Sequence, residues 1–191
     1  MSEPHAVQYE RRGSAALITI DRQHRRNAVD GPTAAALHEA YLCFEEDDDA
    51  RVLVLTGAGG VAFCAGADLK ATDTMAPRLS LPEGPMGFTR LTPSKPTIAA
   101  ISGFALAGGL EIALWCDLRI AAEGSVLGYP ERRWGVPLID GGTPVGQHRA
   151  LRKARQPLGQ RQRPLQVRAR GHHLGHQAHG QRLPRVDQAA R

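Results

Sequence analysis

Runs of four to six mainly apolar residues recur along the first 143 positions, separated by longer segments of mixed character. They are typical of strands buried in a parallel sheet, and they cover residues 15–20, 51–56, 97–101 and 118–122. After Gly31-Pro32, apolar side chains return at helical spacing, which predicts a helix over residues 33–46. Strands that alternate with helix-length segments predict an α/β fold or a β-solenoid with parallel pairing.

Two glycine-rich segments follow strands of this pattern. Residues 63–70 (FCAGADLK) come after the strand at 51–56, and residues 105–111 (ALAGGLE) come after the strand at 97–101. Turns of small residues that leave adjacent strands can aim backbone N–H groups at one point, which is the arrangement that stabilises an oxyanion. The pattern therefore indicates acyl-transfer or enolate chemistry.

A third glycine-rich stretch, residues 57–62, matches the G-x-G-x-x-A pattern of dinucleotide-binding loops. No amphipathic helix follows it, and no acidic residue ends a second strand about 20 residues on, so we interpret it as a turn. Residues 71–95 contain four prolines and predict a mobile excursion that borders a binding site.

Two glutamates stand out as candidate catalytic groups. Glu111 lies in an otherwise apolar stretch, and Glu131 follows it twenty positions later. A carboxylate in apolar surroundings is either paired or functional, because burying it alone is costly. The alternative to catalysis is a surface position or an ion pair with Arg119, Arg132 or Arg133.

Charge divides the chain into two parts. Residues 1–143 carry 13 Lys and Arg against 18 Asp and Glu, whereas residues 144–191 carry 11 Lys and Arg against one acid, Asp187. The second part has no Phe, Trp, Tyr, Ile or Met, so it offers little apolar surface to offset the entropy of ordering. Two interpretations stay open: a disordered or loosely helical tail, or an out-of-frame translation product.

Metal and nucleic-acid binding are the less favoured interpretations of this tail. Glycines interrupt the helical spacing of its histidines, and no aromatic residue is interleaved with its arginines to stack on bases. The clustered histidines are His172, His173, His176 and His179.

The three cysteines show no C-x-x-C spacing, no charged-then-apolar leader opens the chain, and no apolar run approaches the length of a membrane span. We therefore expect a soluble cytoplasmic protein with reduced thiols.

Five motifs, in their order and spacing, resemble the enoyl-CoA hydratase/isomerase (crotonase) family. They are residues 62–69 (AFCAGADL), 95–103 (KPTIAAISG), 107–111 (AGGLE), 116–121 (CDLRIA) and 130–131 (PE). The resemblance covers about residues 7–143, and residues 135–137 (GVP) and 141–143 (GGT) continue it. It implies a spiral of ββα units whose oxyanion hole is formed by the amides of Ala67 and Gly108.

The resemblance also assigns the chemistry. Glu111 and Glu131 match the two catalytic glutamates of the hydratases, and keeping both favours hydration over isomerisation. Asp68, Leu69 and Lys70 match the stretch that lines the CoA-thioester site of the family. Arg25 or Arg26 could offer a guanidinium group to the nucleotide phosphates of CoA. No metal or redox cofactor is implied, because CoA enters as part of the substrate.

We therefore expect a crotonase-like core at residues 1–143 that stops before the C-terminal helical region of the family, followed by the basic tail at 144–191. The expected reaction is the addition of water to a 2-enoyl-CoA, giving a 3-hydroxyacyl-CoA. The rivals are an isomerase on the same fold and an inactive CoA-binding fragment. The family forms trimers or hexamers, but without its C-terminal helices we expect this chain to assemble poorly and to have little activity.

Overall fold

The computed structural model describes residues 6–135, 137–138 and 140. Its strands, α-helices and 3-10 helices follow in this order: β1 (Val7–Arg12), β2 (Ala15–Ile20), η1 (Gln23–Arg25), α1 (Gly31–Glu46), β3 (Val52–Gly57), β4 (Ala62–Cys64), α2 (Thr72–Met75), η2 (Ala76–Ser80), β5 (Thr97–Ile101), β6 (Phe104–Leu106), α3 (Gly108–Trp115), β7 (Leu118–Ala121), β8 (Val126–Gly128) and η3 (Pro130–Trp134).

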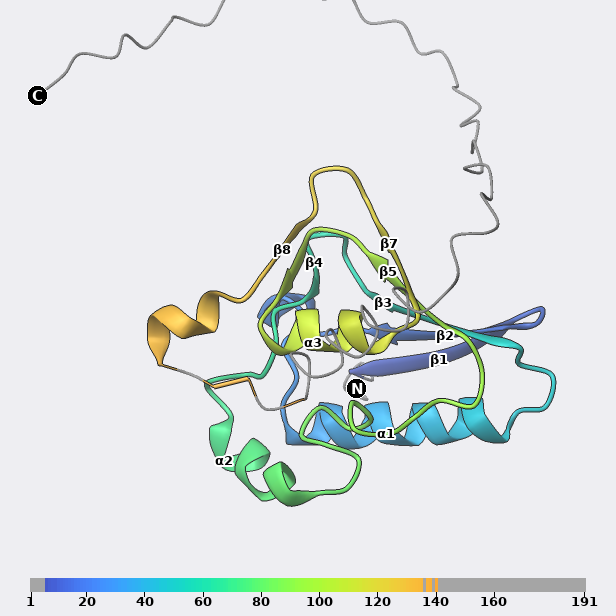
Figure 1. Ribbon diagram of the computed structural model, residues 1–191, viewed down its shortest axis with the longest axis horizontal. Helices are drawn as coiled ribbons and strands as arrows, with labels where there is room; N and C mark the ends of the chain where they lie inside the picture. Colours follow the sequence, from blue (N-terminus) through green and yellow to red (C-terminus); the bar gives the residue numbers. More distant parts are fainter. Residues whose placement is uncertain (1–5, 136, 139, 141–191) are drawn as a thin grey trace, which may run out of the picture. The chain divides into compact units, whose positions relative to one another are not determined.

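The larger of two sheets has five strands in the order β1-β2-β3-β5-β7 (Figure 1). β1 pairs antiparallel with β2, and the remaining neighbours pair in parallel. Apolar residues alternate in burial along β2, where Ala16, Ile18 and Ile20 are buried and the residues between them are partly exposed. This period of two is what a strand with one covered face requires.

The smaller sheet has three parallel strands in the order β4-β6-β8. Each of them follows a strand of the larger sheet, so that β3-β4, β5-β6 and β7-β8 form successive pairs, each followed by helical turns. Sharp turns between the paired strands need glycine, as at Gly59 and Gly60, whose φ angles are +80° and +71°. The spiral of ββα units is therefore confirmed, and residues 57–62 form the expected turn.

Helix α1 begins where the sequence indicates a helix start. Asp30 accepts a hydrogen bond from the backbone N of Thr33 at 2.9 Å, and a proline occupies the first turn. The helix buries Leu37, Tyr41 and Phe44 in the core, as their spacing predicts. The ring of Tyr41 also stacks against other aromatic rings that lie far along the chain.

Residues 84–89, in the middle of the segment 71–95, are anchored to the core, whereas most of residues 71–83 are exposed or partly exposed. The mobility expected for the segment stays a prediction. Met86 and Phe88 are buried, and the ring of Phe88 packs edge-on against that of Trp115 at a centroid distance of 4.7 Å. Gly87 has a φ of +99° and lies so close to Ala34 that a side chain would not fit. The prolines in this segment shape a loop whose apolar side chains still pack inward.

The expectation that residues 118–122 form a fully buried strand is wrong. β7 does form and pairs with β5, but all four of its residues are exposed, Leu118 by 60% and Ile120 by 64%. β7 is an edge strand of the larger sheet among the described residues, so only one neighbour shields it. β3 differs less from the expected fully buried strand: Leu53 and Leu55 are buried, and its other residues are partly exposed.

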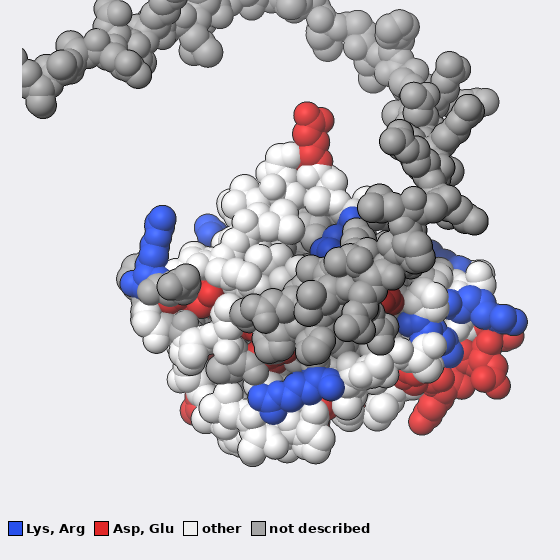
Figure 2. All heavy atoms as spheres, viewed as in Figure 1, with Lys and Arg blue, Asp and Glu red and all other residues white. Residues whose placement is uncertain are grey.

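Charged side chains gather on one side of the described surface in Figure 2, where Figure 1 places the end of α1 and the β1-β2 turn. Arg11 there forms ion pairs with Asp47 and Asp49 at 3.7 and 3.3 Å. Among the described helices, none has the length and apolar character needed to span a bilayer. The predictions for residues 144–191 lie outside the described residues.

Candidate active site

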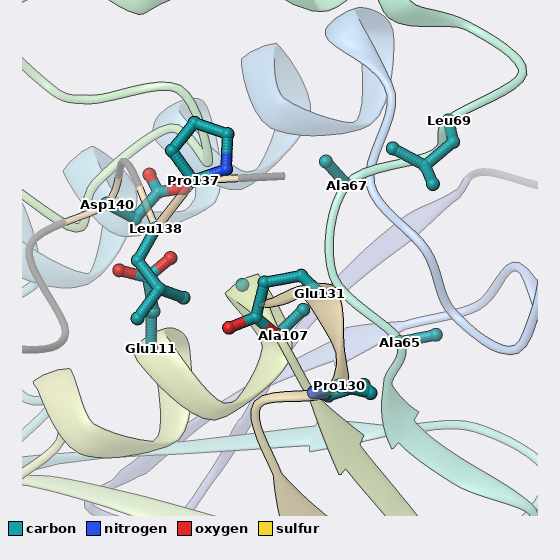
Figure 3. Close-up of a pocket in the computed structure, with 11 residues that line it drawn as sticks. Ala65, Ala67, Leu69, Ala107, Glu111, Pro130, Glu131, Pro137, Leu138 and Asp140 are labelled. Atoms are coloured by element: carbon teal, nitrogen blue, oxygen red, sulfur yellow. The ribbon is translucent and has the colours of Figure 1, made fainter. Parts of the chain in front are cut away.

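A pocket of about 220 Å³ lies between the turns that follow β4 and β6 and the residues around η3 (Figure 3). Its walls are mainly apolar and also carry three acidic side chains. The described residues that line it are Ala65, Ala67, Leu69, Ala107, Gly108, Glu111, Pro130, Glu131, Pro137, Leu138 and Asp140. Both predicted oxyanion-hole residues and both predicted glutamates are in this set.

Backbone pairing orients the amide of Ala67. Val29 donates to the carbonyl of Gly66 and accepts from the N–H of Asp68, both at 2.8 Å, which forms a parallel bridge between Val29 and Ala67. In such a bridge the N–H and C=O of the central residue point away from the partner strand. Ala67 also lines the pocket, and its bridge to Val29 leaves its own amide unused by that strand.

Gly108 opens helix α3 directly after Ala107, which has the unusual backbone angles φ 51° and ψ −125°. The turn carrying Gly108 touches the turn carrying Gly66, since a Cβ built on Gly66 would come within 2.9 Å of the Gly108 nitrogen. Gly66 has a φ of +94°, so glycine is required there for conformation as well as space. The two predicted amide donors are thus held beside one pocket.

Glu111 lies in the first turn of α3 and is only 3% exposed. The helix around it is almost entirely buried, which explains the apolar sequence on both sides of this one acid. A negative charge in the first turn interacts favourably with the N-terminal end of the helix dipole. The position suits a carboxylate that must remain ionised inside a largely apolar pocket.

Glu131 lies in η3 and is 6% exposed. Neither of its carboxyl oxygens has a hydrogen-bond partner within the described part of the chain. Figure 3 shows its carboxyl group directed toward the side of the pocket that carries Glu111. The structure therefore brings the two glutamates into one site from α3 and η3.

The side chain of Asp68 is not in the pocket. Its carboxylate lies 3.2 Å from Arg22 and 4.0 Å from Arg25, and it also accepts from the backbone N of Lys70 at 3.1 Å. The neighbouring Leu69 does line the pocket and is 62% exposed, whereas the Lys70 side chain is exposed outside the lining. Of the three predicted thioester contacts, the structure places only Leu69 at the pocket.

Each of the two arginines proposed for the CoA phosphates already contacts another side chain of the protein. Arg25 lies near Asp68, and the guanidinium of Arg26 lies 5.9 Å from the centre of the Phe104 ring. Arg22, which the sequence reasoning did not select, forms the closer pairs with Asp30 at 2.6 Å and Asp68 at 3.2 Å. It acts as the central cation of a structural cluster.

Asp140 is the main pocket residue that sequence reasoning missed. It is 4% exposed and accepts hydrogen bonds from the backbone N of Met86 at 3.0 Å and from Thr89 Oγ1 at 2.7 Å. Burial raises the pKa of this carboxyl group above its ordinary value. Its position in the sequence, directly after the apolar residues 136–139 and before Gly141-Gly142, could have indicated a buried acid.

Among the described residues, no group of three or more His, Cys, Asp and Glu is arranged so that it could hold a metal ion. The three cysteines are free thiols, with Cys64 and Cys116 buried.

Comparison with known proteins agrees with this geometry. The model of the family described as enoyl-CoA hydratase/isomerase matches residues 10–153. The chain is 41% identical over 147 residues to the carnitinyl-CoA dehydratase of Salmonella arizonae, a match that covers 74% of the chain and 54% of that protein. The chain thus spans about half the length of the curated relatives it matches.

Solved structures give the same result for the fold. The enoyl-CoA hydratase EchA1 from Mycobacterium marinum has a TM-score of 0.69 and 38% identity, covering 78% of this chain and 62% of the other. The carnitinyl-CoA hydratase from Mycobacterium avium has a TM-score of 0.68 and 40% identity, covering 78% and 60%.

Proposed function

The chain belongs to the enoyl-CoA hydratase/isomerase family, and we propose that it acts as an enoyl-CoA hydratase, adding water across the double bond of a 2-enoyl-CoA to give a 3-hydroxyacyl-CoA. The observation that carries this proposal is the pair of buried glutamates, Glu111 and Glu131, in one pocket with the amides of two contacting turns. Fold alone would not support it, because one fold serves many reactions.

In the proposed mechanism, the thioester oxygen accepts hydrogen bonds from the amides of Ala67 and Gly108. Adding an oxygen nucleophile to the β-carbon moves electrons through the conjugated system and places negative charge on that thioester oxygen. Donors fixed by the bridge to Val29 and by the start of α3 stabilise this charge without further reorganisation.

The glutamates move the protons. Glu111 takes a proton from water as the water oxygen bonds to the β-carbon, and Glu131 gives a proton to the α-carbon as the enolate collapses. Each hydration therefore adds one hydrogen and one hydroxyl to the acyl chain, and solvent exchange resets the two carboxyl groups. Neither step uses a metal or a redox cofactor, and CoA enters as part of the substrate.

The thioester and its nucleotide would lie against Leu69 at the open side of the pocket, with Arg25 and Arg26 as candidate phosphate contacts. A homo-oligomer is part of the proposal because family members are generally oligomeric.

A second candidate function is the dehydration of a carnitinyl-CoA. This reaction is the reverse of hydration, and its acyl chain carries a positive charge. Relatives of that printed name are about 40% identical to this chain. Three acidic side chains line the pocket, and none of its described lining residues is Lys, Arg or His. Such a lining favours a positively charged acyl group over an anionic one.

The experiment is to incubate the full 191-residue chain separately with crotonyl-CoA and carnitinyl-CoA and to identify the products by mass spectrometry. We expect slow formation of 3-hydroxybutyryl-CoA from crotonyl-CoA, since the sequence predicts little activity for this chain. A product with a shifted double bond and no added water would identify an isomerase instead. Binding of both thioesters without turnover would leave only the CoA-binding fragment.

A substitution at Gly108 tests the oxyanion hole. Gly108→Pro removes the N–H, and proline is tolerated at the first position of a helix, so we expect a folded protein without activity. Gly108→Ala is the matched control, since it keeps the N–H and its Cβ would meet the flexible end of Met86 at 3.2 Å and, at the ordinary contact distance of 3.5 Å, the Cα of Gly66. If the proline variant is folded and retains most of the parent activity, this amide is not a donor.

A further inference from the structure

Tyr129 is a polar group at the candidate site that the proposed mechanism does not use. It lies between β8 and η3, and its ring packs against the core. Its hydroxyl oxygen is buried and has no hydrogen-bond partner among residues 6–135, 137–138 and 140. Buried hydroxyl groups are usually satisfied, so this one requires an explanation.

The surroundings of this hydroxyl are acidic. The pKa of Tyr129 is raised to about 12, first because the phenol is buried and then because of the negative charges of Glu111 and Glu131. Glu111 faces it from α3 and Glu131 from η3, while Asp140 is a third acid on the same pocket. The phenol therefore keeps its proton at ordinary pH and is available as a donor.

Within the described structure, Glu131 offers hydrogen-bond acceptors that lack a donor, whereas Tyr129 offers a donor that lacks an acceptor. Both of its carboxyl oxygens are buried without a hydrogen-bond partner in the part of the chain that the structure describes. Only Pro130 separates Glu131 from Tyr129, and proline fixes the backbone between them at the start of η3. The hydroxyl of Tyr129, a donor, and the two carboxyl oxygens of Glu131, both acceptors, are thus all buried without a hydrogen-bond partner among the described residues, and they belong to residues two positions apart in the sequence.

We propose that Tyr129 is a positioning residue whose hydroxyl donates a hydrogen bond to the Glu131 carboxylate once Glu131 has given up its proton. The tyrosine keeps its O–H bond throughout, so no further acid or base enters the reaction. The hydrogen bond holds the carboxylate in place for reprotonation and stabilises its ionised state. This role rests on the proposed hydratase function, whereas the hydrogen bond itself does not.

The first test observes Tyr129 directly and requires no turnover. The chain has three tyrosines, so labelling tyrosine with ¹³C at Cζ gives three resonances, each assigned by its loss in a Tyr→Phe variant. We expect Glu131→Gln to lower the pKa of the Tyr129 phenol, which is titrated at alkaline pH where a carboxyl group has given up its proton, while the Tyr9 and Tyr41 resonances stay in place.

Glu123→Gln is the matched control for this measurement. Glu123 is exposed in the β7-β8 connection, so its loss should move none of the three resonances. A Tyr129 phenol pKa that is the same in Glu131→Gln as in the parent would overturn the proposal. Because this variant keeps Tyr129, the result does not depend on the folding of a Tyr129 substitution.

The second test is kinetic and uses Tyr129→Phe. We expect kcat to fall about 10-fold, the equivalent of one hydrogen bond to a charged group, with KM for crotonyl-CoA nearly unchanged. The alkaline limb of the pH–rate profile, which reports the general acid, should move to higher pH, because the ionised acid loses its donor. A loss confined to protein stability would not move that limb.

Tyr9→Phe controls for removal of a buried hydroxyl. The Tyr9 hydroxyl is also buried and forms no hydrogen bond of normal geometry among the described residues, but it lies on β1 near Asp47. This variant should keep the parent kcat and pH profile, and identical profiles for both variants would contradict the proposal. A parent chain without turnover would argue against the hydratase function, and the tyrosine resonances would still decide whether the hydrogen bond exists.

Discussion

Two buried acids, Asp68 outside the pocket lining and Glu131 within it, are equally inaccessible to solvent, each 6% exposed. Asp68 lies beside Arg22 and Arg25 and accepts from the backbone N of Lys70. Glu131 has no hydrogen-bond partner in the described structure. The difference teaches that pairing, rather than burial, separates an acid that holds the fold together from one that can exchange protons.

The two arrangements have different costs. Ionised Asp68 is compensated by cations, so it stabilises the turn after β4 that carries the amide of Ala67. A buried carboxyl group without partners lowers stability, and proteins keep such groups mainly where function needs them. The comparison therefore predicts opposite outcomes when each acid is neutralised.

The largest effect is expected for Glu131→Gln. The amide has the same shape but cannot deliver a proton, so hydration of crotonyl-CoA should fall by at least about 10²-fold while thioester binding persists. The free energy of unfolding should stay the same or increase, because a buried carboxyl group without a hydrogen-bond partner among the described residues is replaced by an amide that cannot ionise. Turnover within a few-fold of the parent would remove Glu131 from the proposed mechanism.

Asp68→Asn should show the reverse pattern. Removing the charge leaves Arg22 with Asp30 as its remaining ion-pair partner among the described residues, so we expect a loss of about 2–3 kcal/mol in the free energy of unfolding. Urea denaturation measures this loss, and turnover per folded molecule should change only a few-fold. A variant as stable as the parent would show that the cluster is not structural.

The smallest effect concerns Asp140, which is hydrogen-bonded but has a raised pKa because it is buried. Such a group stabilises the fold fully below the pKa of the unfolded chain, about 3.9, and that contribution is lost as pH rises through the higher folded-state pKa. Relative to Asp140→Asn, the parent should therefore lose stability as pH rises from about 4 into the neutral range. Parallel stability curves in urea unfolding across that range would contradict this expectation.

Local sequence patterns predicted much of the fold. The strand at 15–20, the strand at 97–101 and helix α1 appear nearly as expected, because each is long enough to show a period. β4, β6 and β8 have three residues each, too few for a period to be recognised. The exposure of β7 was not predicted either, since a strand's own residues do not reveal what packs against it.

The candidate site shows the same limit. The two turns and the two glutamates could be selected from residue type, spacing and family resemblance, and the structure places them around one pocket. The roles of Arg22 and Asp140 depend on partners 46 and 51 or more positions away, which no local pattern encodes. The unpartnered hydroxyl of Tyr129 could be recognised only from three-dimensional burial.

The strand order of the larger sheet also bears on how such a protein can change through evolution. The strands β2, β3, β5 and β7 follow one another in the sheet in chain order. A substitution in one ββα unit should therefore change the packing of that unit and of the units next to it more than that of distant units. The pocket draws its residues from the turns of successive units rather than from a single one. Specificity can thus be altered one turn at a time, in the region of η3 for example, while the unit that supplies Ala67 keeps its geometry.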